Sequence, residues 1–154
     1  MKRLLTVIAW IIALQLISAM LAWLTQQGLD PWYAGLMKSA LTPPRWLFPI
    51  VWPLLYVLLA IVGWQLWSTR HNHPLAWRLY AVQMLMNWAW TPLFFGLQWM
   101  IVAALWLSVM VVITLYLIVR TWSQQRLCSV LLLPYVAWIS FASYLSITIA
   151  LLNG

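Results

Sequence analysis

Five long apolar segments constrain the fold of this chain more than any other feature. They cover about residues 4–25, 46–67, 79–97, 100–119 and 127–152. Each is close to the roughly 20 residues that an α-helix needs to cross the hydrocarbon core of a bilayer. A segment in lipid must satisfy its own backbone hydrogen bonds, so all five are predicted to be helices. We therefore expect an all-α membrane protein, a five-transmembrane-helix bundle that forms a single domain over residues 1–154.

The composition supports this class and excludes others. Hydrophobic residues make up 66% of the chain and charged residues 6%, and the mean hydropathy is +0.94. A soluble domain needs a charged surface that these residues do not supply. The net charge of +7 comes from residues at the ends of the apolar segments. We therefore expect membrane lipid as a partner and no nucleic acid.

The basic residues predict an orientation. Two of them, Lys38 and Arg45, share one side with the single acid, Asp30, in a loop of about residues 26–45. The six basic residues of the other side are Lys2, Arg3, Arg70, Arg78, Arg120 and Arg126. The positive-inside rule then places the amino terminus in the cytoplasm and the loop outside, in what we expect to be a bacterial inner membrane.

The first apolar segment has two interpretations. Lys2 and Arg3 before it, and the small residues of "SAMLA" near its end, are typical of a signal peptide. The segment is longer than a signal core, and small residues are common at contacts between transmembrane helices. We favour an uncleaved first helix.

Several kinds of chemistry lack the residues they need. The five segments contain no ionisable Asp, Glu, Lys, Arg or His, which disfavours an ion-coupled transporter. One acid in the chain excludes paired-carboxylate hydrolysis. His71 and His73 lack a third ligand nearby, so no metal site is expected, and the lone Cys128 excludes an internal disulfide.

Aromatic and amide side chains remain, and helical spacing sorts them into faces. Residues Phe48, Trp52 and Tyr56 share one face of the second segment, as do Gln83, Asn87 and Trp90 of the third. In the fifth segment a stripe recurs every four residues; it consists of Trp138, Ala142, Ser146 and Ala150. One interpretation is helix packing, which spacing alone favours for the small residues of the fifth segment; for Gln83 and Asn87, spacing does not decide between interhelical hydrogen bonds and a ligand site. The other is a ligand pocket with indole walls, because a buried indole offers a flat surface and an N–H that needs a partner.

Three blocks of sequence resemble a known family. They are "WYAGLMKSALTPPRWLFPIVWPLLY" at 32–56, "QMLMNWAWTPLFFG" at 83–96 and "LLLPYVAWISFASYL" at 131–145. These blocks and the five-segment layout are similar to the TspO/MBR family of tryptophan-rich sensory and translocator proteins. The resemblance implies a five-helix bundle, often a homodimer, with a pocket below the first loop. Family members bind porphyrins such as protoporphyrin IX, synthetic ligands and, in animal members, cholesterol, and no cofactor is required.

The resemblance also implies roles for residues. Trp52 and Trp138 match pocket tryptophans implicated in porphyrin binding and in proposed porphyrin breakdown, which makes them the candidate catalytic residues. The predicted ligand-binding residues are Lys38, Pro44, Phe48, Trp52, Tyr56, Gln83, Asn87, Trp90, Trp138, Ala142 and Leu145.

Departures from the family pattern limit what is carried over. The chain has Lys38-Ser39 where Lys-Pro is usual, and Leu145-Ser146 where Leu-Asn is common. No basic residue follows Arg126, so the animal cholesterol-recognition pattern is missing and steroid binding through it is not expected.

The proline-rich stretch before and inside the second segment suggests a lid and a rigid rim. Pro43 and Pro44 restrict the loop as it enters the bundle. Pro49 falls in the first helical turn, where a missing N–H costs little, and Pro53 frees a carbonyl one turn back. We expect this stretch to present Phe48, Trp52 and Tyr56 to a flat ligand.

Three functions stay open from the sequence. The leading one is a tetrapyrrole-binding membrane receptor or transporter with a stress- or metabolism-sensing role. The second is an enzyme that degrades porphyrin with light or oxygen through Trp52 and Trp138. The third is a regulatory interaction protein that associates through the small-residue pairs Ala9/Ala13 and Ser18/Ala22.

Overall fold

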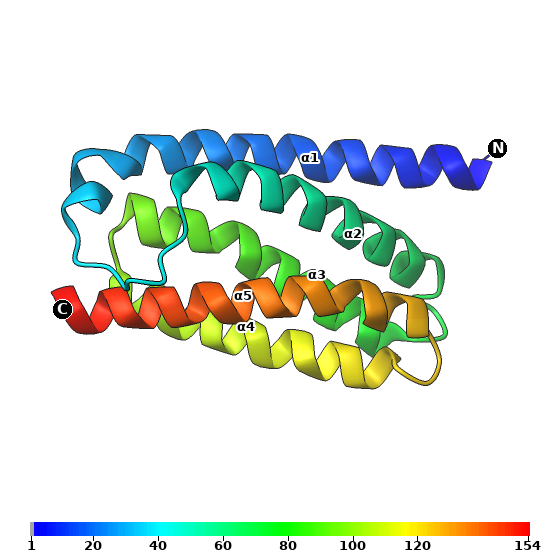
Figure 1. Ribbon diagram of the computed structural model, residues 1–154. Coiled ribbons are helices and arrows are strands. Elements are labelled where there is room, and N and C mark those ends of the chain that lie inside the picture. Colours follow the sequence, from blue (N-terminus) through cyan, green and yellow to red (C-terminus); the bar gives the residue numbers. More distant parts are fainter. Residues whose placement is uncertain (1) are drawn as a thin grey trace.

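The computed structural model describes residues 2–154 as a bundle of five long helices (Figure 1). The helices are α1 (Lys2–Gly28), α2 (Phe48–Ser68), α3 (Pro74–Thr91), α4 (Met100–Thr121) and α5 (Arg126–Asn153). Short helical turns at Leu29–Tyr33, Arg45–Leu47 and Pro92–Gly96 complete the secondary structure of the described chain, which has no strand. The predicted all-α, five-helix membrane fold is confirmed.

Within residues 2–154, four helical stretches are long and apolar enough to cross a bilayer by length and composition. These are Arg3–Gln27, Arg45–Ser68, Met100–Thr121 and Arg126–Asn153. The shorter α3 carries Arg78, Gln83 and Asn87, which lower its hydropathy. The two amides are buried inside the bundle, so they do not face the lipid.

Prolines account for a difference between the predicted and observed bounds of the third helix. We expected a helix over about 79–97, whereas α3 begins at Pro74 and ends at Thr91. Proline is well tolerated at the first helical position, because its missing N–H would have no partner there. Pro92 begins a separate turn, Pro92–Gly96, since a proline interrupts the regular hydrogen bonding of a helix.

The first loop is shorter than the predicted 26–45, because α1 runs to Gly28 and a kinked helical turn follows over Leu29–Tyr33. The segment without regular structure, which we call the long loop, covers residues 36–44. Pro49 lies in the first turn of α2 and Pro53 lies inside it. The side-chain amide of Gln15 donates a 2.8 Å hydrogen bond to the carbonyl of Pro53, which ties α1 to the start of α2.

The helices form a closed ring in the order α1, α2, α5, α4, α3, and the turn after α3 returns to α1. The amino terminus and the short connections 69–73 and 122–125 lie at one end, which we call the amino-terminal end (Figure 1). The long loop and the carboxyl terminus lie at the opposite end, the loop end. This arrangement separates Arg70 and Arg126 from Lys38 and Arg45, as the charge distribution predicted.

The amino-terminal half of the bundle, which we call the solid half, contains the main hydrophobic core. Its buried core includes Leu59 and Val62 of α2, Tyr80 of α3, Leu117 of α4 and Leu132 of α5. A Cβ atom on Gly63 would overlap the side chains of Tyr80 and Trp10, so α1, α2 and α3 approach as closely as a glycine allows. The loop half differs, because it encloses the cavity described next.

Candidate functional site

A cavity of about 630 Å³ occupies the loop half of the bundle. All five helices and the long loop contribute to its wall, so it is a product of the whole fold. Its volume falls within the roughly 300–1,000 Å³ that is typical of small-molecule sites. Apolar surface predominates in the lining, and polar groups stand at a few positions.

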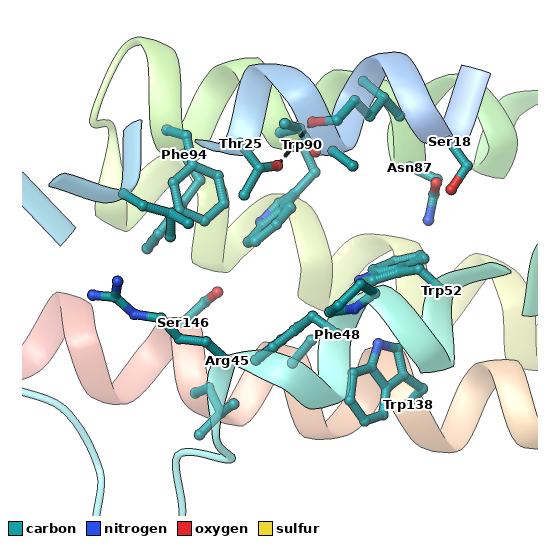
Figure 2. Close-up of a pocket in the computed structure, with 18 of the residues that line it drawn as sticks. Ser18, Thr25, Arg45, Phe48, Trp52, Asn87, Trp90, Phe94, Trp138 and Ser146 are labelled. Carbon is teal, nitrogen blue, oxygen red and sulfur yellow. Dashed lines mark hydrogen bonds between the residues drawn. The ribbon is translucent and has the colours of Figure 1, made fainter. Parts of the chain in front are cut away.

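Two walls face one another across the cavity (Figure 2). Phe48 and Trp52 from α2 and Trp138 from α5 make up one wall, and Trp90 from α3 belongs to the other. The rings of Phe48 and Trp138 meet edge to face, with centroids 5.8 Å apart. The ring centroids of Trp52 and Tyr56 lie 5.9 Å apart. These contacts hold large rings in fixed positions and leave flat surface toward the cavity.

An aromatic cluster closes the loop end of the cavity. Trp90 stacks on Phe94 with centroids 5.2 Å apart and planes 13° from parallel. Phe94 is buried and also contacts Trp32 and Tyr33, which precede the long loop. The loop is therefore seated on the same rings that line the cavity.

Two indole N–H groups on the cavity wall have no hydrogen-bond partner. These are the Nε1 atoms of Trp90 and Trp138, both of which are buried. The hydroxyl of Thr42, from the long loop, is also buried on this wall without a partner. Buried polar groups are nearly always hydrogen-bonded in folded proteins. The three residues line the cavity, but the unpartnered atoms themselves are buried away from the cavity surface.

The first helix supplies polar groups that sequence reasoning did not assign to the site. Gln15, Ser18, Thr25 and Gln26 of α1 line the cavity, and Figure 2 shows Ser18 and Thr25 opposite the α2 and α5 wall. The expected association pair Ser18/Ala22 thus lies on the cavity wall, whereas Ala9 and Ala13 are exposed on the bundle surface. Residues 15, 18, 22 and 25 are spaced along one helical face, and this spacing could have assigned α1 to the site.

A chain of hydrogen bonds forms the deep end of the cavity, at the border with the solid half. The Tyr56 hydroxyl donates to Asn87 Oδ1 at 2.6 Å, and Asn87 Nδ2 donates to the Tyr135 oxygen at 3.1 Å. The Tyr135 hydroxyl donates in turn to Gln83 Oε1 at 2.8 Å. Tyr56 and Asn87 line the cavity, whereas Tyr135 and Gln83 lie behind them.

Charged groups gather at the loop end. Arg45 and Asp30 form an ion pair of 3.5 Å, with side chains 57% and 70% exposed. Lys38 Nζ donates to the carbonyls of Leu36 and Ala34 and lies 4.8 Å from the centre of the Tyr33 ring. Burial, and secondarily the nearby charge of Arg45, lowers the pKa of Lys38. Burial raises the pKa of Tyr33, and the Arg45 charge partly offsets this rise.

Ser39, which stands where the family pattern has proline, links the long loop to α5. Its hydroxyl lies 2.9 Å from the hydroxyl of Tyr144 and also accepts a hydrogen bond from the Leu41 N–H. The rigidity that a proline would provide is replaced here by a side-chain contact.

The structure brings most of the predicted ligand-binding residues together on the cavity wall. Those that line it are Lys38, Phe48, Trp52, Tyr56, Asn87, Trp90, Trp138, Ala142 and Leu145. Pro44 does not line it, because it is exposed just before the turn Arg45–Leu47. Gln83 does not line it either, because it lies one helical turn deeper than Asn87, where Tyr135 fills the space. Within residues 2–154, no three His, Cys, Asp or Glu side chains gather in a metal-binding arrangement.

Comparison with known proteins gives matches along nearly the whole chain. The sequence model of the TspO/MBR family matches residues 7–152. The chain is 36% identical over 153 residues to the tryptophan-rich protein TspO of Archaeoglobus fulgidus, covering 99% of each chain. It is 35% identical over 130 residues to Protein CrtK of Rhodobacter capsulatus, covering 79% of this chain and 78% of that protein. It is 38% identical over 125 residues to the translocator protein of Sus scrofa, covering 75% of this chain and 70% of that one.

Proposed function

Because this chain belongs to the TspO/MBR family of membrane proteins, we propose that it is an integral-membrane receptor or transporter whose cavity binds a porphyrin-type tetrapyrrole. The observation that carries the proposal is the cavity in the loop half of the bundle, on whose facing walls Trp52, Trp90 and Trp138 stand. Indoles that served packing alone would fill the bundle centre. These indoles instead border a space large enough for a small molecule.

The chemistry of a porphyrin matches the two kinds of group around the cavity. Its broad planar ring suits contact with the flat faces of Trp52 and Trp138. Its carboxylate side arms suit the cations Lys38 and Arg45, which stand at the loop end where the indoles give way to polar groups. The ring would enter first and the carboxylates would remain near the long loop.

The proposal includes an orientation in the membrane. The amino-terminal end, which carries Arg70, Arg120 and Arg126, faces the cytoplasm of a bacterial inner membrane, and the long loop faces outward. A ligand then meets the cavity from the outer side. We also propose that the protein acts as a homodimer, as the family resemblance implies. If the protein is a receptor, ligand binding in the cavity is the signal. If it is a transporter, the bound ligand is the molecule that is transported.

The binding experiment is a titration of the purified protein with protoporphyrin IX, followed by tryptophan fluorescence. We expect saturable quenching at micromolar ligand, and a weaker affinity for Trp138→Phe because that ring borders the cavity. The matched control is Trp106→Phe, which removes an indole whose N–H is already bonded to the Met86 carbonyl at 2.8 Å and which does not line the cavity. Absence of saturable quenching, or equal affinities for the two variants, would contradict the proposal.

A second candidate function is porphyrin breakdown under light and oxygen. It is favoured by one observation: Trp52 and Trp138 line the same cavity, so one bound ring would contact both redox-active side chains. Illumination of the complex in air should then bleach the porphyrin absorbance in the wild-type protein and in Trp106→Phe, but not in Trp138→Phe. Equal bleaching in all three would leave the protein as a binding protein only.

A further inference from the structure

Two buried side chains that do not line the cavity are bonded to two that do. Tyr135 and Gln83 are each 0% exposed, and they continue the hydrogen-bond chain that begins at Tyr56 and Asn87. The Tyr135 oxygen also lies 3.8 Å from Met110 Sδ, which is a weak acceptor. The chain thus runs from the deep end of the cavity into the solid half of the bundle.

The direction of each hydrogen bond in the chain is constrained by the number of hydroxyl and amide protons that the four side chains carry. Tyr135 has a single O–H, which it donates to Gln83 Oε1, so its oxygen is left to accept from Asn87. Asn87 must therefore turn its NH₂ group toward Tyr135 and its carbonyl toward Tyr56. The Tyr56 hydroxyl is then committed as a donor to Asn87. The oxygen of Tyr56, which the Trp88 side chain also approaches as a donor, keeps a lone pair, and Asn87 keeps a second N–H.

The opposite polarity results if the Gln83 amide is inverted, and the number of hydrogen bonds then stays the same. With its Nε2 donating to Tyr135, the tyrosine would donate to Asn87 Oδ1, and Asn87 would donate to Tyr56. Three hydrogen bonds would join the four side chains, as three do now, and the Tyr56 O–H would be free to donate into the cavity. In the structure Gln83 presents Oε1 to Tyr135, and its Nε2 has no hydrogen-bond partner.

We propose that Gln83 and Tyr135 are positioning residues that set the hydrogen-bond polarity of the deep end of the cavity, acting through Asn87 and Tyr56. The inference rests on the proposed function for its ligand: the observed polarity suits a group that accepts from Asn87 and donates to Tyr56. A tetrapyrrole ring, which carries both ring nitrogens and N–H groups, has this combination. The polarity itself is a property of the ligand-free protein.

The first experiment therefore uses the protein without ligand. The side-chain amide signals of Asn87 are recorded by nitrogen-15 NMR and assigned by their loss in Asn87→Ala. In Gln83→Met, which keeps the length of the side chain and removes its amide, Tyr135 retains only the weak acceptor Met110 Sδ beside it. Its hydroxyl should then donate to the stronger acceptor, Asn87 Oδ1. We expect the Asn87 amide to turn, giving displaced or doubled signals. Unchanged Asn87 signals would overturn the proposal.

A matched control separates this effect from the loss of any buried hydrogen bond. Tyr80→Phe removes a buried hydroxyl that donates to the Leu59 carbonyl at 2.8 Å and has no bond to the chain. Tyr135→Phe makes the same chemical change within the chain. We expect Asn87 signals to move in Tyr135→Phe and to stay in place in Tyr80→Phe. If Tyr135→Phe does not fold, Gln83→Met alone carries the comparison.

The second experiment measures protoporphyrin IX affinity of the same variants. Gln83→Met and Tyr135→Phe should each weaken binding by about fivefold to tenfold, the effect of one misdirected hydrogen bond. Tyr80→Phe should stay within about twofold of wild type. In an Asn87→Ala background Gln83→Met should have no further effect, because the residue through which it acts is gone. A full additional loss in that background would overturn the proposal. If the wild type does not bind the porphyrin, the proposed function fails, and the ligand-free amide signals still decide this inference.

Discussion

The side-chain amide of Asn153 pairs with the backbone of Met37 through two hydrogen bonds of 2.9 Å, one accepted from the Met37 N–H and one donated to its carbonyl. The two residues are 116 positions apart, and the pairing fastens the long loop to the last turn of α5 (Figure 1). The same amide nitrogen also donates to the Ile149 carbonyl, which orients it for the loop. Together with the Ser39–Tyr144 contact, it holds closed the end of the cavity where Lys38 stands.

Removing this amide should loosen the long loop. Asn153→Ala eliminates both bonds to Met37, so we expect amide hydrogens of residues 36–44 to exchange about tenfold faster, as loss of roughly one net hydrogen bond predicts. The dissociation rate of protoporphyrin IX should rise with it, because residues of the long loop line the cavity in which we propose that it binds. Hydrogen exchange with mass spectrometry measures the first effect and stopped-flow fluorescence the second. Asn72→Ala, in the connection at the amino-terminal end, is the control. Equal exchange in the two variants would show that the pairing does not hold the loop.

Charges at the loop end should matter for a ligand with carboxylates and not for its neutral form. Arg45→Ala should weaken protoporphyrin IX binding by about twofold to fivefold, the range of an exposed ion pair. Its affinity for the dimethyl ester, which lacks the charges, should not change. Arg120→Ala removes an exposed charge at the opposite end and serves as the control. A loss for the ester equal to that for the acid would mean that Arg45 acts through the loop structure, not through charge.

Lys38 should make porphyrin binding weaken at alkaline pH. Burial and the Arg45 charge lower the pKa of Lys38, so its ammonium loses the proton at a lower pH than a free lysine does. Burial raises the pKa of the neighbouring Tyr33, so its hydroxyl loses its proton at a higher pH than a free tyrosine does. Affinity for the porphyrin dicarboxylate should therefore fall as the pH rises through the Lys38 pKa. The porphyrin affinity of Lys38→Arg should not change over the same pH range, because a guanidinium stays charged. Titrations at a series of alkaline pH values test this, and parallel curves for the two proteins would contradict it.

The fold was predictable because its determinants are local. Apolar segments of sufficient length must be helices in lipid, and Pro74 and Pro92 shift the bounds of α3 by an effect that depends only on neighbouring residues. Aromatic residues of the cavity wall could also be predicted from the sequence. Phe48 and Trp52 lie four residues apart on one helical face, and that spacing survives in the structure as a shared position on the wall.

The contribution of α1 was not predictable from local sequence. Ser18 and Thr25 in an apolar run are equally consistent with a contact between helices and with a cavity wall. Which one applies depends on the order of helices around the ring, a tertiary property that places α1 between α2 and α3. The same limit explains Gln83. It shares a face with Asn87, yet Tyr135 of α5 fills the space beside it and ends the cavity one turn earlier.

The close approach of helices in the solid half predicts a sharp cost for a single methyl group. In Gly63→Ala the added Cβ would overlap the Tyr80 hydroxyl and lie 2.8 Å from Cζ3 of Trp10, so the side chains of Tyr80 and Trp10, or the helices that carry them, must shift. We expect a loss of about 1–3 kcal/mol in the free energy of unfolding, the usual effect of overpacking. Gly35→Ala is the control, since no atom lies within 4 Å of its added Cβ. The loss should shrink in a Tyr80→Phe background, where the clashing oxygen is absent. Thermal unfolding in detergent compares these variants with the wild type, and equal midpoints for Gly63→Ala and Gly35→Ala would show that the helices separate freely at this point.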